Sequence, residues 1–177
     1  MIRSKLFSLG TIAALAVGGM ALSTTSAAAV DPTADTVATL TAAGINVDEL
    51  APGWTVEGGY IVWDDGDVIA SIEPAAYDDC SSGYVCFFQD KSYSGRMLQF
   101  HDTGLRGDMR DYSFNDQMSS WRSRRALDAR WYYDYNGSGT SRCIESGAAN
   151  SDVGAGLLNT DNDEMSSFRI YTDDNRC

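Results

Sequence analysis

The chain has few histidines, few positive charges, and no apolar run after its first residues that could span a membrane. It holds one histidine, His101, and no C-x2-C pair among its four cysteines, so the residues do not predict a zinc site. No G-x-S-x-G turn is present and no pair of carboxylates is marked out for glycoside cleavage, so we do not expect an enzyme. With 13 Lys and Arg against 25 Asp and Glu, the chain also lacks the basic footprint that nucleic acid requires.

The first 29 residues have the pattern of an export signal. Arg3 and Lys5 precede an apolar stretch over residues 6–22, and Ala27-Ala28-Ala29 supplies an A-x-A cleavage site. The apolar stretch is shorter than the ~20 residues that a membrane span needs. We therefore predict a signal peptide at 1–29 and a secreted, extracellular protein with no membrane association after its removal.

Acidic residues dominate the segment that follows. Residues 31–74 contain no Lys or Arg and nine acids: Asp31, Asp35, Asp48, Glu49, Glu57, Asp64, Asp65, Asp67 and Glu73. The pattern predicts a short helix around 33–43, ended by Gly44, and two or three strands over 54–73. We expect residues 30–74 to be a propeptide or an accessory hairpin segment before a domain at 75–177. The alternative is an extension that stays packed on that domain.

The four cysteines fit two disulfides in an oxidising compartment, with three possible connectivities. We expect Cys80–Cys86 and Cys143–Cys177, because each bridge then stays within its own part of the chain. In the chain-entropy model the two bridges contribute about 2.4 and 3.8 kcal/mol.

A two-part repeat organises the rest of the sequence. NDQMSSW at 115–121 recurs as NDEMSSF at 162–168, and FQDKSYSG, which starts at Phe88, is matched by YYDYNGSG, which starts at Tyr132. Such a repeat predicts two structural units, at about 80–125 and 126–177, stacked in one domain. Short strands between turn residues predict an all-β sandwich with four strands in each unit. We expect the apolar residues of the two repeated segments in the core: Met118, Trp121, Met165 and Phe168.

These segments resemble the βγ-crystallin Greek key, in which an aromatic-x4-aromatic-x-Gly hairpin is followed by N/D-N/D-x-x-S/T-S. The resemblance implies two Greek-key motifs that form a βγ-crystallin-like sandwich. The second hairpin departs from the pattern because Gly137 stands where the second aromatic belongs, which predicts a weaker corner. More narrowly, CSSGYVCFFQDKSYSGRMLQF resembles the metallopeptidase type of peptidase inhibitors built on the crystallin fold.

We call Asn115-Asp116…Ser119-Ser120 and Asn162-Asp163…Ser166-Ser167 the two tetrads. The resemblance implies calcium at these tetrads, with oxygen ligands from side chains and backbone. One half-site would combine Asp116, the Gln117 carbonyl and Ser119 near Asn115, completed by the hairpin loop at 134–136. The mirror half-site would use Asp163, the Glu164 carbonyl and Ser166 near Asn162, completed by the loop at 90–92. The alternative is that these residues only form turn hydrogen bonds.

In crystallin-like inhibitors the reactive segment lies in the second unit beside a cysteine, which here implies Arg142-Cys143-Ile144-Glu145. The alternative is that Cys143 is only a structural half-cystine on a strand. We therefore expect a monomeric secreted inhibitor of an extracellular peptidase, stabilised by Ca²⁺. The alternative function is a calcium-binding structural or surface-interaction protein without a peptidase target.

Overall fold

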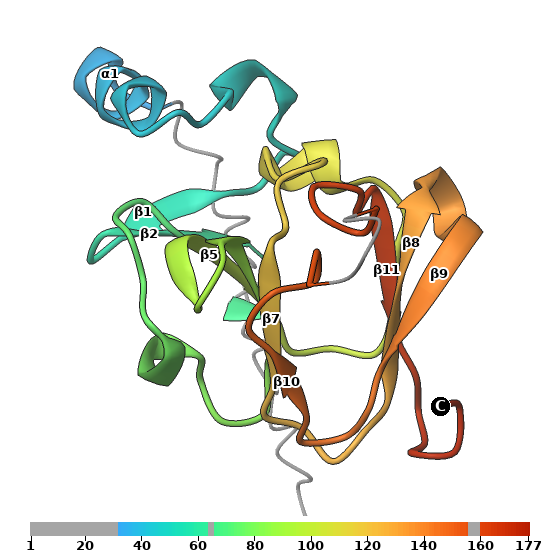
Figure 1. Cartoon of the computed structure of the whole chain (residues 1–177). Coiled ribbons are helices and arrows are strands. Elements are labelled where there is room, and N and C mark those ends of the chain that lie inside the picture. The colour runs from blue at the N-terminus through green and yellow to red at the C-terminus, as the bar shows by residue number, and fades with distance from the viewer. Residues whose placement is uncertain (1–31, 64–65, 156–159) are drawn as a thin grey trace, which may run out of the picture. The chain divides into compact units, whose positions relative to one another are not determined.

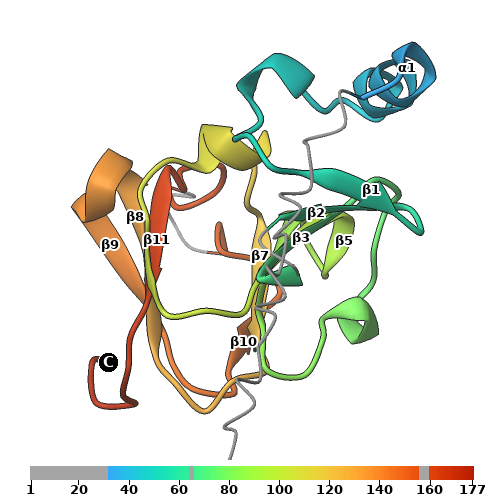
Figure 2. The same cartoon turned by 180° about the vertical axis from the view of Figure 1, so that it is seen from behind.

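The computed structural model describes residues 32–63, 66–155 and 160–177, and it contains two β-sheets with short helical segments (Figures 1 and 2). The predicted signal peptide lies outside the described residues. The elements are α1 (Ala34–Ala42), β1 (Thr55–Glu57), β2 (Tyr60–Trp63), β3 (Val68–Ser71), β4 (Val85–Asp90), β5 (Ser94–Phe100), β6 (Gly104–Arg106), β7 (Ser120–Ser123), β8 (Ala129–Asp134), β9 (Ser138–Ile144), β10 (Ala149–Asn150) and β11 (Ser167–Ile170).

Strand order defines two Greek keys that exchange one strand each. One sheet has the order β1-β2-β3-β5-β4-β7-β10, and the other has the order β6-β11-β8-β9. In the first unit β4 and β5 form a hairpin and β7 returns beside β4. In the second unit β8 and β9 form the hairpin and β11 returns beside β8. The third strand of each unit, β6 or β10, pairs in the sheet of the other unit. The predicted βγ-crystallin-like sandwich of two Greek keys is therefore confirmed.

The second serine of the first tetrad holds the hairpin of its own unit. The Ser120 hydroxyl donates to the Asp90 carbonyl at 2.6 Å and accepts from the Tyr93 backbone N–H at 3.0 Å. Tyr93 has a φ of 59°, a left-handed conformation that is strained for a residue with a side chain.

The second unit repeats this corner with a glycine. The Ser167 hydroxyl donates to the Asp134 carbonyl at 2.6 Å and accepts from the Gly137 N–H at 2.9 Å. Gly137 has a φ of 71°, which glycine adopts without strain. The departure from the aromatic pattern thus leaves the hydrogen bonds of this corner the same as those of the first.

The acidic N-terminal segment continues the sheet of the first unit. β3 pairs with β5 through Val68↔Phe100 and Ala70↔Leu98, and β2 and β1 extend the sheet beyond it. The predicted helix and strands of this segment are present. Its buried apolar residues belong to the same core as the repeat units: Leu40, Ile45, Leu50, Ile61, Trp63, Val68, Ala70 and Ile72. The segment is therefore packed on the domain as part of one compact unit that spans residues 31–177.

Aromatic side chains join the two sheets. The Phe168 ring lies 4.9 Å from that of Phe87 and 4.7 Å from that of Phe100, and all three residues are fully buried. Burial of Phe168 and of the other three expected core residues confirms that prediction: Met118, Trp121 and Met165. Packing of this kind fixes the register of the strands that carry the tetrads.

Both disulfides pair as expected. Cys80 is bonded to Cys86 and Cys143 to Cys177, with Cα–Cα separations of 5.8 and 5.7 Å. The second bridge fastens the end of the chain to β9.

Candidate functional site

The two tetrads lie directly against each other. The Asp116 N–H donates to the Met165 carbonyl at 3.1 Å, and the Asp163 N–H donates to the Met118 carbonyl at 3.1 Å. Asp116 and Asp163 both have left-handed backbones, with φ values of 52° and 58°. This local geometry is the same in both copies, so the repeat in sequence is a repeat in structure.

The first serine of each tetrad points to the aspartate of the other. The Ser119 hydroxyl lies 3.3 Å from Asp163 Oδ1, and the Ser166 hydroxyl lies 3.3 Å from Asp116 Oδ1. This corrects the half-sites expected from the sequence, which combined the aspartate and serine of one repeat. The crossing follows from the exchange of backbone hydrogen bonds between the tetrads, which sets each aspartate beside the other unit's serine.

A pocket of about 420 Å³ opens beside the pair of Ser119 and Asp163. It is lined by the tip of the β4–β5 hairpin (Gln89–Lys91), by both aspartates and by Gln117, Ser119 and Asn162. The Ser119 N–H donates to the Phe88 carbonyl at 3.0 Å, which sets the serine against its own hairpin. The loop near Asp90 thus lies beside Asp163, as expected. It also lies beside Ser119, which was expected to lie beside the hairpin loop at 134–136.

The electrostatics of this pocket favour a cation. Burial raises the pKa of Asp116, and the negative charge of Asp163 raises it further, whereas hydrogen bonds from Ser166 and Asn115 oppose the shift. Two carboxylates that repel each other in this way are stabilised by a positive charge between them. Lys91 lines the pocket, but its amine is paired with Asp152 at 3.1 Å.

Oxygen atoms without partners make the tetrads fit a hard metal ion. The Oδ1 atoms of Asn115 and Asn162 are buried and accept no hydrogen bond from any residue that the structure describes. Both amides are held by their other end, because Nδ2 donates to Asp116 Oδ2 at 2.7 Å and to Asp163 Oδ2 at 2.6 Å.

Further oxygens are available in the backbone. Within the described part of the chain, no hydrogen bond ends on the carbonyls of Gln117 or Glu164. The buried Oδ1 atoms of Asn115 and Asn162 are costly without a donor, and a set of carboxylate, amide, carbonyl and hydroxyl oxygens is the kind that calcium takes. The residues therefore fit calcium, and the structure brings all eight predicted ligand residues to the two facing tetrads.

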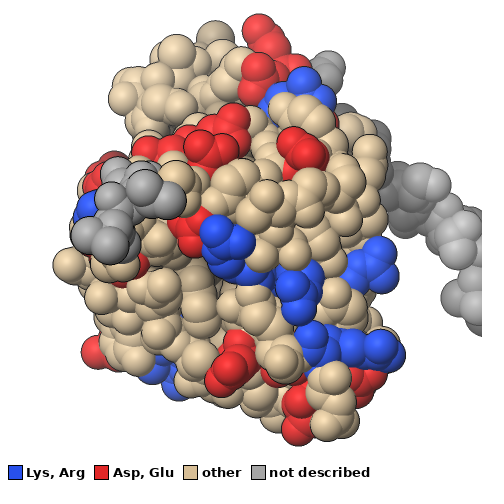
Figure 3. Space-filling model, turned by 45° about the vertical axis from the view of Figure 1, so that its right-hand side comes forward, with Lys and Arg blue, Asp and Glu red and all other residues tan. Residues whose placement is uncertain are grey.

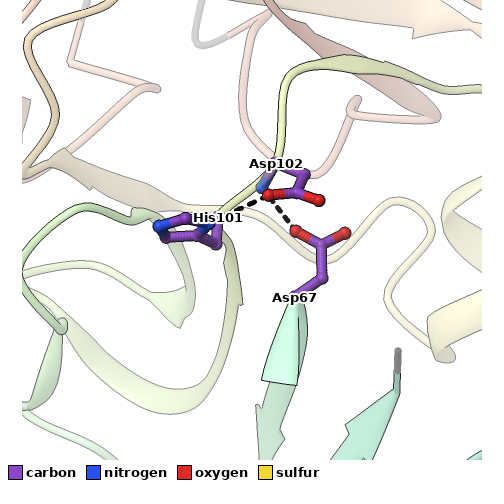
Figure 4. A group of neighbouring side chains, drawn as sticks. All are labelled: Asp67, His101 and Asp102. Carbon is purple, nitrogen blue, oxygen red and sulfur yellow. Dashed lines mark hydrogen bonds and ion pairs between the residues drawn. The ribbon is translucent and has the colours of Figure 1, made fainter. Parts of the chain in front are cut away.

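A second group of metal-capable side chains, Asp67, His101 and Asp102, has a different explanation (Figure 4). His101 Nδ1 lies 3.0 Å from Asp102 Oδ1. Asp67 accepts a hydrogen bond from the Asp102 N–H through Oδ1 and pairs with Arg106 through Oδ2. Because Arg106 already supplies a cation, this group joins the β2–β3 turn to the loop after β5 rather than presenting an open metal site.

The predicted inhibitory segment is not a free loop. Arg142, Cys143 and Ile144 end strand β9, which pairs with β8 on one side and lies at the edge of its sheet. Ile144 is fully buried, and Arg142 forms a two-pronged ion pair with Asp161 at 2.7 and 2.6 Å. Of the four residues, Glu145 is exposed and the Arg142 side chain is 43% exposed. The structure matches the alternative in which Cys143 is a half-cystine on a strand, and alternation along β9 turns Ile144 into the core.

The exposed part of this region is the turn after β9, residues 145–147. Its Ser146 N–H donates to Asp128 Oδ1 at 3.0 Å, and its Gly147 N–H donates to the Arg125 carbonyl at 3.1 Å. The turn is therefore held at two of its three residues and at the Cys143–Cys177 bridge beside it.

Asp128 holds both the turn after β9 and the last residues of the chain, a role that the sequence analysis did not predict. Its Oδ2 accepts from the N–H groups of Arg176 and Cys177, both at 2.9 Å, while Oδ1 holds Ser146. Burial acts to raise the pKa of Asp128, but the three backbone donors outweigh burial and lower it. The only signal in sequence is an acid between Leu127 and Ala129 at the start of an apolar strand.

Among the described residues, no helix is both long and apolar enough to cross a membrane.

Comparison with known proteins gives one family and one fold. The model of peptidase inhibitor family I36 matches residues 73–144. The chain therefore resembles a family of inhibitors rather than of enzymes, as predicted from the sequence. No curated protein matches it.

Several solved βγ-crystallin domains are similar to about half of the chain. One, from work on the evolution of the eye-lens βγ-crystallin domain fold, is 21% identical with a TM-score of 0.47, and the match covers 55% of this chain and 94% of that one. A βγ-crystallin from Ciona intestinalis is 24% identical with a TM-score of 0.44, covering 50% and 100%. A domain from Clostridium beijerinckii is 24% identical with a TM-score of 0.40, covering 50% and 97%. The Greek-key assignment itself rests on strand order and register.

Proposed function

We propose that this chain is an exported inhibitor of extracellular peptidases, carried on a crystallin-like domain that calcium stabilises. The observation that carries the proposal is the match to peptidase inhibitor family I36 over residues 73–144. That range includes the first Greek key, the Cys80–Cys86 bridge and the hairpin of β8 and β9. It ends at Ile144, directly before the exposed turn.

The turn at 145–147 and the edge of β9 form the surface best suited to contact a peptidase. An inhibitor binds tightly when its contact segment is already ordered, because little conformational entropy is then lost on binding. Asp128, the Arg125 carbonyl and the Cys143–Cys177 bridge supply that order. The free edge of β9 also offers backbone N–H and C=O groups that can pair with a strand of the peptidase.

Calcium would be held by the crossed tetrads. Asp163 and Ser119 with the β4–β5 hairpin tip would hold one ion, and Asp116 and Ser166 would hold the other. The ion would neutralise the facing carboxylates and use the free amide oxygens of Asn115 and Asn162. Because each half-site joins both repeats, bound calcium would stabilise the packing of one Greek key on the other.

The second candidate function is a calcium-binding structural protein with no peptidase target. It is favoured by the composition of the paired site, because the pocket at the tetrads is lined by no residue of the turn at 145–147. Calcium binding alone therefore does not separate the two candidates.

Measuring peptidase inhibition by charge-altered variants distinguishes the two candidate functions. The purified protein is tested against a panel of secreted metallo- and serine peptidases, and Glu145→Arg is compared with wild type. An inhibitor should lose potency in Glu145→Arg at an unchanged melting temperature, because Glu145 is exposed and forms no ion pair within the described residues. Arg142→Glu should change both quantities, because it breaks the ion pair with Asp161. A structural protein would show no inhibition in any form.

A further inference from the structure

A row of residues crosses the outer face of the four-stranded sheet. Register places Leu105 of β6, Arg169 of β11, Arg130 of β8 and Cys143 of β9 side by side. The residues that alternate with them along the strands are buried: Phe168, Ile170, Ala129, Trp131 and Ile144. Because successive side chains of a strand point to opposite faces, Arg169 and Arg130 point away from the core.

The two arginines of this row have no carboxylate partner in the described part of the chain. Arg130 donates to the Ser141 hydroxyl and to the Arg176 carbonyl, both at 3.2 Å, and the Arg169 guanidinium makes no hydrogen bond or ion pair there. They stand directly opposite each other on neighbouring strands. Like charges in that position destabilise a sheet, so the pair is a cost to the isolated fold.

The end of the chain adds a third arginine to this face. Arg176 is fixed beside Arg130 by its carbonyl, by Asp128 and by the neighbouring Cys177 bridge. Its ion pair with Asp173 is 57% and 35% exposed at the two side chains, and such surface pairs bind weakly. We call Arg130, Arg169 and Arg176 the arginine face. Figure 3 brings the side of the molecule with β8 and β9 forward and shows Lys and Arg gathered across it.

This face is unusual in a chain whose net charge is −12. A local cluster of cations, two of them without a carboxylate partner among the described residues, attracts an anionic surface and speeds its encounter with the protein. Nucleic acid is a poor candidate because it requires a wider basic footprint. The face adjoins β9 and the turn at 145–147, where the proposed function places the peptidase.

We propose that the arginine face docks on an acidic surface beside the substrate cleft of the target peptidase and steers the two proteins together. The proposal rests on the proposed function for the identity of the partner. Charges at the rim of an interface act mainly on the association rate and on its dependence on salt. The face therefore adds target preference to an inhibitor whose contact segment is the β9 edge and its turn.

The test measures association rate constants for a peptidase that the wild type inhibits. Wild type, Arg169→Gln and the double variant Arg130→Gln/Arg169→Gln are compared from about 0.01 to 1 M ionic strength, where the Debye length falls from ~30 to ~3 Å. Arg110→Gln is the control for one lost charge, because Arg110 is exposed and lies outside the arginine face, paired with Asp108. We expect the double variant to associate about tenfold more slowly at low salt, with convergence at high salt and little change in dissociation.

A salt dependence of the double variant equal to that of wild type and Arg110→Gln would overturn the proposal. Retention on immobilised poly-L-glutamate at low salt is a second measurement that needs no peptidase. Wild type should be retained more strongly than the double variant, and equal retention would also overturn the proposal. Absence of inhibition by wild type contradicts the proposed function instead, and the retention result then decides on the arginine face alone.

Discussion

The Ser119 hydroxyl lies 3.3 Å from Asp163 Oδ1 although the two residues are 44 positions apart and belong to different Greek keys. Ser166 and Asp116 form the mirror contact at the same distance. Each candidate ion site therefore contains residues from both units. The pairing has consequences for which substitutions should act together.

We predict that calcium raises the unfolding temperature and that the crossed pairs act as units. Calcium at a hundredfold excess over its Kd stabilises a single site by about 2.7 kcal/mol. Ser119→Ala and Asp163→Asn should each remove part of this gain, and the double variant should lose little more. Ser119→Ala with Asp116→Asn should be closer to additive, because these residues serve different half-sites.

Melting curves in calcium and in chelator measure each variant. Ser138→Ala is a matched control, because its exposed hydroxyl bonds only the Tyr135 carbonyl among the described residues. Equal melting temperatures for wild type in calcium and chelator would contradict the site. Stronger coupling within one repeat than across the repeats would contradict the crossing.

The N-terminal segment should contribute strongly to stability. Ile61→Ala removes a fully buried side chain on β2 and should lower the free energy of unfolding by about 3 kcal/mol. Val56→Ala on β1 is the control, because Val56 is 40% exposed and should cost less than about 0.5 kcal/mol. Urea denaturation checks both values. A chain that begins at residue 75 and unfolds at the wild-type midpoint would show that the segment is dispensable.

Asp128 should make the free energy of unfolding depend on pH in the acidic range. Its folded pKa is lowered, so its contribution is complete above the ordinary carboxyl pKa of about 3.9 and disappears as pH falls through the folded value. Asp128→Asn should cost about 3 kcal/mol at neutral pH, because an amide cannot accept all three backbone donors.

The measurement is the free energy of unfolding from neutral pH to about pH 3, a range that crosses the ordinary carboxyl pKa. The gap between wild type and Asp128→Asn should narrow as pH falls below about 4. Asp174→Asn on the exposed tail is the control and should follow wild type throughout. A gap that stays constant with pH would show that the charge of Asp128 is not what holds the tail.

The two disulfides should differ in their contribution. Replacing Cys143 and Cys177 with serine should cost about 3.8 kcal/mol, against about 2.4 for Cys80 and Cys86, because the first bridge closes the longer loop. The sequence separations are 34 and 6 residues. Denaturation of the two double variants tests the order, and a larger loss for Cys80 and Cys86 would contradict it.

The sequence predicted features whose cause is local. The helix near 33–43, the long strands and the core positions of Met118 and Phe168 follow from turn residues and alternation. The strands β6 and β10 were not predicted, because three and two residues carry too little pattern. Their pairing is set by the strand exchange between units, which is a property of the whole fold.

The candidate site shows the same limit. The tetrads identified the residues, since Asn, Asp and Ser supply oxygens in a tight loop, but not which aspartate meets which serine. Asp128 was missed because its partners are backbone groups, and the burial of Ile144 was missed because alternation within a short strand does not show which of its faces meets the core. Each of these depends on tertiary packing rather than on neighbours in sequence.

The most direct test of inhibition is a titration of an extracellular peptidase with the folded protein. With the peptidase well above the Kd, activity should fall linearly and reach its minimum at one inhibitor per enzyme. At the same ratio of inhibitor to enzyme, Glu145→Arg should leave more peptidase activity than wild type, without a change in melting temperature. If every peptidase in a metallo- and serine-type panel keeps its activity at a several-fold molar excess of the folded protein, the inhibitor function is contradicted.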